Sequence, residues 1–184
     1  FYLAHGLKRS TTIAAVATLF SVLMTGIMAS VFIKSTNITG TGLEDAFFLQ
    51  TTSDIPINLP NLLIAGIIIS ALGVLDDVTI SQVYFVDKIF EKDRKLKLMD
   101  LYKESMSLGK NHISSMINTL VLTYTGSSIS LLLLFSVSGI TMHNLLNLEV
   151  VALEIVRTLV SSIVLMLAIP LTTFFAAYLK VGNC

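Results

Sequence analysis

Charged side chains are scarce in this chain. Asp, Glu, Lys and Arg together make up 13% of its 184 residues, while hydrophobic residues make up 54%. A soluble domain usually has about a quarter of its residues charged. A soluble helical protein with a very apolar core could also have this composition, but a chain of this length cannot bury four long apolar segments at once. The composition therefore predicts an integral membrane protein.

Other absences exclude further classes of protein. Cys184 is the single cysteine, so the sequence has no disulfide or thiolate metal framework. The net charge is zero and gives no indication of nucleic-acid binding. There is no nucleotide-binding motif, so an ATPase would be a separate polypeptide, and no metal or other cofactor is predicted. Because the chain begins at Phe1 rather than Met, we expect it to be part of a longer protein.

Long apolar stretches make up most of what is present. Each meets or exceeds the roughly 20 residues that a helix needs to cross a hydrocarbon core about 30 Å thick. We predict an all-α, polytopic membrane protein with one transmembrane domain, residues 1–184, whose spans are about 11–33, 59–83, 113–139 and 150–179. In the loop between the first two spans, Gly40 and Gly42 precede a stretch expected to form a surface helix, Leu43–Leu49.

Basic residues are concentrated in alternate loops. Lys8 and Arg9 precede the first span and Lys180 follows the fourth, whereas the connection between the third and fourth spans has no Lys or Arg. By the positive-inside rule, both termini and the basic 84–110 loop lie in the cytoplasm, which gives an N-in/C-in, multi-pass protein of the plasma membrane.

The segment 88–108 within that loop has a charged side and apolar residues at helical spacing, including Leu98, Leu101 and Leu108. One interpretation is an interfacial helix that lies along the bilayer beside anionic headgroups. The other is a docking helix for a cytoplasmic partner. The expected partners are therefore the lipid bilayer and either a cytoplasmic protein or further copies of the chain.

Polar residues interrupt the spans at a similar depth. Counting 1.5 Å per residue from the basic loop places them in the inner half of the membrane. A charge there costs about 2.5–3.5 kcal/mol on insertion scales, and a proline removes a backbone hydrogen bond. Such a layer could bind a cation, relay protons or tie helices together. The predicted substrate or ion site comprises Asp76, Asp77, Gln82, His112, Asn118 and Pro170.

The adjacent aspartates point in different directions. About 100° separates Asp76 from Asp77 around a helix, so they cannot both face the same partner. We expect one to point into the bundle and the other towards a neighbouring helix or the cytoplasmic interface. The alternative is that the second span ends near Asp76 and leaves both carboxylates at a wet helix end.

Polar residues also occur towards the outer side and at mid-membrane. The i,i+3 spacing of Glu154 and Arg157 allows an ion pair in the fourth span. This pair either only neutralises the two charges or forms part of an outer gate. Thr123 and Tyr124, near mid-membrane in the third span, are expected to form hydrogen bonds between helices.

Three blocks occur in order along the chain: Gly73–Gln82 (GVLDDVTISQ), Gly109–Ser115 with Asn118–Gly126 (GKNHISS, NTLVLTYTG), and Glu154–Val160 with Ile169–Thr173 (EIVRTLV, IPLTT). Together they resemble the signature of YibE/F-like bacterial membrane proteins. The resemblance implies a multi-spanning protein of the bacterial inner membrane, with further helices upstream, and it implies no particular activity. Where the family is expected to have an Arg-Asp pair before its histidine, this chain has Lys110 and Asn111.

These features support two functional hypotheses. The first is a transporter or permease component for a small solute or ion, with the inner polar layer as its site. The second is a non-transporting scaffold subunit that docks a cytoplasmic partner through residues 88–108. An enzyme is not expected and no catalytic residue is predicted, because proteolysis by two carboxylates needs them on different helices. His5, His112 and His143 fall on both sides of the predicted membrane, which argues against a shared zinc site.

Overall fold

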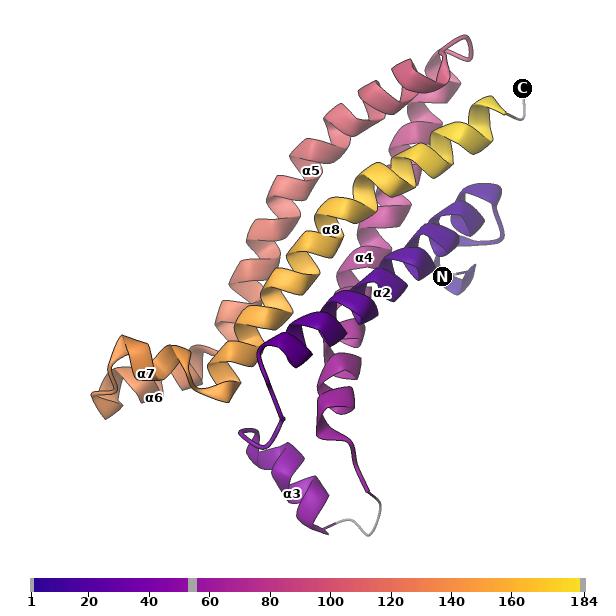
Figure 1. Cartoon of the computed structure of the whole chain (residues 1–184). Helices are drawn as coiled ribbons and strands as arrows, with labels where there is room; N and C mark the ends of the chain where they lie inside the picture. Colours follow the sequence, from indigo (N-terminus) through magenta and orange to yellow (C-terminus); the bar gives the residue numbers. More distant parts are fainter. Residues whose placement is uncertain (1, 53–55, 183–184) are drawn as a thin grey trace.

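The chain folds into a bundle of long helices (Figure 1). The computed structural model describes residues 2–52 and 56–182, so Cys184 lies outside the described residues. The long helices are α2 (Arg9–Ser35), α4 (Leu59–Lys92), α5 (Leu98–Ser127) and α8 (Glu149–Val181). The short ones are α1 (Tyr2–His5), α3 (Glu44–Thr52), α6 (Ile129–Ser138) and α7 (Met142–Leu146). Every element in the described ranges is a helix, which confirms the predicted all-α fold class.

The long helices have the length and composition of membrane spans. α2, α4 and α8 are each long and apolar enough to cross a membrane, and they contain the first, second and fourth predicted stretches. The pair α5 and α6 passes the same test only when taken together, so the described residues provide three candidate spans, or four with this pair. The expected surface helix in the first loop is present as α3.

The third predicted span, 113–139, is not one straight helix. α5 ends at Ser127 and α6 begins at Ile129, and the two axes differ in direction by 56°. Small and hydroxyl-bearing residues occupy the break, where the Ser127 hydroxyl and the Ser128 backbone N–H both bond to the carbonyl of Tyr124. Such side-chain bonds compete with the helical ladder and weaken it. α6 and α7 contain no buried residues and project away from the bundle (Figure 1).

The segment 88–108 also differs from the prediction, because it is not a separate helix on the membrane surface. α4 continues to Lys92, a turn follows, and α5 begins at Leu98. Part of the apolar side of this segment is packed, since Phe90 and Leu101 are buried in a core cluster with α2 and α8 residues, while Met99 and Leu108 are exposed. The segment therefore forms the connection between two long antiparallel helices and leaves its charged side chains outside.

α8 holds the bundle together through contacts with α2, α4 and α5. Its buried face includes Val160, Val164 and Ala168, which pack with Leu75 and Val78 of α4. Large apolar side chains on the outside remain uncovered, and Ile27 of α2 is 66% exposed. A bundle with such a surface is suited to lipid rather than water as its solvent.

One end of the bundle carries most of the basic residues and is called the basic end below, defined by Lys8, Lys92, Lys97 and Lys180. There, Lys180 Nζ lies 2.9 Å from Asp87 Oδ1, and the hydroxyl of Ser10 donates to the other carboxylate oxygen of Asp87. This cluster joins the start of α2 to the ends of α4 and α8, so these three helix ends lie side by side.

Candidate functional site

A pocket of about 430 Å³ lies between α4 and α5. Its polar members are one carboxylate, Asp77, and the hydroxyls of Ser70, Thr119, Thr123 and Tyr124. The remaining lining is formed by Gly73, Val74, Met116 and Leu120. We call this space the Asp77 pocket. The surface of this pocket is mainly apolar, but its carboxylate and hydroxyl oxygens are ligands of the kind that bind hard cations.

The two adjacent aspartates occupy different surroundings, as their 100° separation requires. Asp77 is exposed towards the pocket, whereas Asp76 is half-buried. The Oδ1 atom of Asp76 is buried and has no hydrogen-bond partner within the described part of the chain. Both residues lie inside α4, which continues as a helix to Lys92, so the alternative of a helix end near Asp76 is not what the structure shows.

Gln82 is fully buried and joins three helices. Its Nε2 atom donates to the backbone carbonyl of Ser105 in α5 at 3.1 Å and to the hydroxyl oxygen of Thr173 in α8 at 2.7 Å. Gly109 of α5 lies directly against it, because a Cβ atom there would be 2.6 Å from Gln82 Oε1. The Gln82 amide therefore fixes the packing of these helices and does not face a space that could hold a ligand.

The other predicted site residues, all described, lie elsewhere. The His112 ring packs edge-on against Phe85, with the ring centroids 6.0 Å apart. Asn118 is exposed and does not line the Asp77 pocket. Pro170 lines a different pocket, shared with Phe20 of α2 and other residues, and α8 stays helical through it. Pro170 lacks a backbone N–H without interrupting α8, and the bend in the long helices lies between α5 and α6.

Tyr124 connects α4, α5 and α8. Its hydroxyl lies 2.7 Å from Ser70 Oγ and 3.3 Å from Ser161 Oγ. This confirms the predicted interhelical hydrogen bonding for Tyr124. Thr123 differs from the prediction, since its hydroxyl donates to the carbonyl of Thr119 in the same helix.

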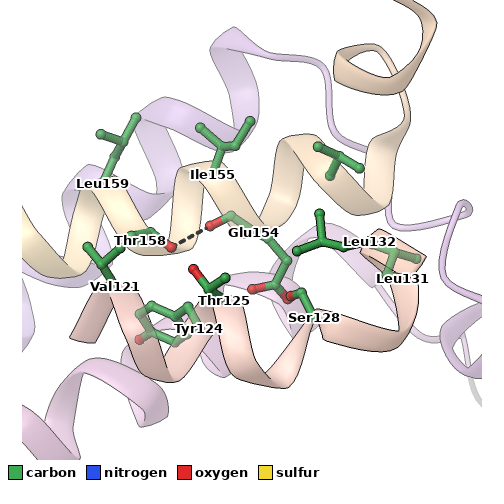
Figure 2. A pocket seen from close by; sticks show the side chains of 11 residues that line it. Val121, Tyr124, Thr125, Ser128, Leu131, Leu132, Glu154, Ile155, Thr158 and Leu159 are labelled. Carbon is green, nitrogen blue, oxygen red and sulfur yellow. Dashed lines mark hydrogen bonds between the residues drawn. The ribbon is translucent and has the colours of Figure 1, made fainter. Parts of the chain in front are cut away.

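A second pocket of about 320 Å³ lies where α5 breaks into α6, against α8 (Figure 2). We call it the Glu154 pocket, and Figure 2 shows the carboxylate of Glu154 pointing toward Ser128. The other polar side chains of the lining belong to Tyr124, Thr125 and Thr158, and the rest of the lining is aliphatic. Polar groups at a break between two helices are typical of ligand and ion sites in membrane transporters.

Glu154 and Arg157 form the ion pair that their spacing allows. Arg157 Nη1 lies 2.9 Å from Glu154 Oε1, and the two side chains are 27% and 25% exposed respectively. The pair does not use all of its hydrogen-bonding atoms, because Glu154 Oε2 and Arg157 Nε are buried without a hydrogen-bond partner among the described residues. The role of this pair as an outer gate stays a prediction.

Glu149, at the start of α8, is a polar site that the sequence analysis did not identify. Its carboxylate accepts hydrogen bonds from the backbone N–H groups of Gly40 and Gly42, the latter at 2.9 Å, and from the hydroxyl of Thr39. Gly40 has φ of +86°, which favours glycine. An acidic first helical turn and a Gly-x-Gly loop were the available signals, but their pairing across more than 100 residues is a tertiary property.

The described residues contain no group of three or more His, Cys, Asp or Glu arranged to hold a metal ion. The sequence model of the family described as YibE/F-like protein matches residues 1–181. No curated protein and no solved structure matches the chain.

Proposed function

The chain belongs to the YibE/F-like protein family, and from this premise we propose that it is a plasma-membrane permease component that moves a small solute or ion. Its helices are long and apolar enough for a membrane protein. The observation that carries the proposal is the Asp77 pocket, in which an exposed carboxylate and several hydroxyls face a space of about 430 Å³ within a candidate span.

A carboxylate in this position opposes insertion of α4 into the bilayer. Insertion scales give about 2.5–3.5 kcal/mol for a charge at the helix centre. Ionisable residues inside membranes typically face a bundle interior or a water-filled cavity and mark the route of an ion or substrate. Asp77 meets this description, because it lines a pocket between two helices rather than a purely apolar surface.

The test compares the wild-type chain with Asp77→Asn after reconstitution into lipid vesicles. Volume changes followed by light scattering under a glycerol gradient report the passage of a small solute, and ion-sensitive dyes trapped in the vesicles report the passage of K⁺, Na⁺ and Cl⁻ separately under gradients of KCl and NaCl, without requiring a known substrate. We expect at least one of these fluxes in the wild type and a decrease of ten-fold or more in Asp77→Asn.

Asp45→Asn is the matched control, because Asp45 lies in α3, outside the candidate spans. It should leave the flux unchanged. A wild-type flux that survives in Asp77→Asn, with the thermal unfolding midpoint also unchanged, would show that the carboxylate has no part in passage. No flux from the wild type under any of the gradients would reject the permease proposal itself.

The second candidate function is a scaffold that binds a cytoplasmic protein through the segment 88–108. The observation that favours it is the exposed turn between α4 and α5, which presents Lys92, Arg94, Lys95 and Lys97. Since the turn itself presents these basic side chains, a partner that binds here would carry an acidic surface. A partner captured by the wild type and lost on Arg94→Gln with Lys95→Gln would support the scaffold, while capture unaffected by these changes would argue against it.

A further inference from the structure

Tyr124 lies at the boundary between the two pockets. It contributes to the lining of both the Asp77 pocket and the Glu154 pocket. Its hydroxyl bonds to Ser70 on α4 and to Ser161 on α8, so the side chain spans the groove between these helices, beneath α5. Movement of this one side chain would therefore join two spaces that are separate in the structure.

The two pockets are offset along the bundle. The Asp77 pocket extends from Tyr124 towards the basic end, where Met116 lines it, and the Glu154 pocket extends in the opposite direction to Leu131 of α6. Each contains one carboxylate and at least two hydroxyl groups besides that of Tyr124. The arrangement is a pair of mainly apolar spaces, each with one carboxylate and a few hydroxyl groups, one on each side of a tyrosine.

The chemistry of the two pockets favours cations. Carboxylate and hydroxyl oxygens can replace the water around a hard cation, and the carboxylate repels an anion. In the Glu154 pocket the Oε1 atom is paired with Arg157, while Oε2 is buried and has no partner among the described residues. The arginine leaves an acceptor available while it lowers the net negative charge. Conduction requires such moderate affinity, because an ion must be able to leave its site.

A hinge lies next to Tyr124. The chain bends by 56° between α5 and α6, and the carbonyl of Tyr124 accepts the last i→i+4 bond of α5, from the Ser128 N–H, together with the Ser127 hydroxyl. Residues at element ends can absorb a change in backbone angles that a continuous helix resists. Because the bend follows Tyr124 in the chain, it lets α6 move away from the Glu154 pocket, and Tyr124 leaves the groove by a side-chain rotation that breaks its bonds to Ser70 and Ser161.

We propose that Tyr124 is the gate between an inner and an outer pocket of one pathway, and that the pathway takes small monovalent cations. The proposal rests on the proposed permease function and adds its ion class and its gate. In the closed state, the bonds to Ser70 and Ser161 hold the ring between the pockets. In the open state, the Asp77 and Glu154 pockets become continuous.

Cysteine accessibility tests the gate independently of transport. In a Cys184→Ser background, Thr119→Cys places a thiol in the Asp77 pocket and Thr125→Cys places one in the Glu154 pocket, on the two sides of Tyr124 along α5. A positively charged, membrane-impermeant thiol reagent is applied to intact cells and to inside-out membrane vesicles. With Tyr124 present, we expect each cysteine to react from one face of the membrane, and from opposite faces.

Adding Tyr124→Ala should raise the rate of reaction from the opposite face at least ten-fold for both cysteines. Tyr124→Phe, which keeps the ring and removes the hydroxyl, should raise it several-fold and covers the case in which the alanine variant does not fold. Leu122→Ala is the control, since Leu122 is 71% exposed and lines neither pocket, and it should change nothing. Unchanged rates in a folded Tyr124→Ala or Tyr124→Phe protein, or thiols that react from neither face, would overturn the gate.

Flux measurements separate this proposal from the permease proposal. In vesicles, Tyr124→Ala should raise K⁺ flux at least ten-fold and leave Cl⁻ flux unchanged, and an equal rise in Cl⁻ flux would overturn the ion class. If Asp77→Asn abolishes the flux but Tyr124→Ala changes neither the thiol labelling nor the flux, the permease proposal is supported and the gate proposal is rejected. If Tyr124→Ala exposes both thiols but neither the wild type nor Tyr124→Ala passes ions, the two pockets are joined as proposed and the permease proposal is rejected.

Discussion

The amide of Gln82 and the hydroxyl of Thr173 meet inside the bundle, with 2.7 Å between Gln82 Nε2 and Thr173 Oγ1. Thr173 in turn donates to the carbonyl of Ile169 in its own helix, so its hydroxyl is used as both donor and acceptor. This contact fixes α4 against α8, and the second bond of Gln82, to the Ser105 carbonyl, fixes α5. It can do so because Gly109 allows α5 to approach closely.

Gly109→Ala is therefore expected to destabilise the protein. The added Cβ would lie 2.6 Å from Gln82 Oε1 and 2.9 Å from Ile169 Cγ2, and the glutamine cannot move aside without losing its bonds. Overpacking of this kind typically costs about 1–3 kcal/mol. The measurement is the thermal or denaturant-induced unfolding of the purified protein in detergent micelles.

Gly126→Ala is the control for this experiment, because it lies in the same helix and a Cβ there meets no atom within 4 Å. It should leave stability unchanged or raise it slightly through the better helix propensity of alanine. Equal stability of the two alanine variants would show that α5 does not approach α4 and α8 as closely as the structure places it.

A second prediction concerns Glu149. Glu149→Gln removes the charge that two backbone N–H groups and the Thr39 hydroxyl recognise, and it should destabilise the protein by about 1–2 kcal/mol. Because the bonds hold the loop that follows α2, proteolysis at residues 37–42 should also become faster. Glu44→Gln is matched, since Glu44 is likewise the first residue of a helix, and its effect should be smaller. A larger effect at Glu44 would contradict the role given to the loop.

Much of the fold could be predicted from hydropathy, because a helix that crosses a membrane must be apolar along its length. This is why α2, α4 and α8 contain their predicted stretches. Hydropathy depends on composition and carries no information about the direction of a helix axis, so it could not predict the bend at Ser128. The connection between α4 and α5 was misjudged for a related reason: apolar residues such as Leu101 suit a membrane surface as well as the protein interior they occupy.

The candidate site was predictable in part. Asp77 and Gln82 were identified because a polar residue in an apolar stretch is costly to place in a membrane and usually contacts another polar group or a cavity. Which of them faces a pocket depends on how helices turn toward one another, and the sequence alone does not determine this. Asn118 shares the depth of Asp77 but is exposed and lies outside its pocket. Pairings such as Glu149 with Gly42 join residues that are remote in the chain and needed the structure to be found.

A third prediction concerns the cluster at the basic end. Asp87→Lys removes the ion pair with Lys180 and brings two positive charges together, so it should destabilise the bundle by about 1 kcal/mol. Reversing the pair, with Asp87→Lys and Lys180→Asp together, should recover part of the loss. The unfolding midpoint of the four proteins at low and high salt gives the coupling energy. A double variant no more stable than the sum of the single effects would show that the pair contributes nothing.

The last prediction concerns orientation. Lys92, Arg94, Lys95 and Lys97 crowd the connection between α4 and α5, and the Ser10 contact with Asp87 brings the start of α2 to the same end. The positive-inside rule then places this end in the cytoplasm. In a Cys184→Ser background, a thiol introduced by Lys95→Cys should resist an impermeant reagent in intact cells and react in inside-out vesicles, whereas one introduced by Thr41→Cys should do the opposite. The reverse pattern would overturn the N-in/C-in orientation and would place Asp77 in the outer half of the membrane, which would also exchange the inner and outer assignments of the two pockets beside Tyr124.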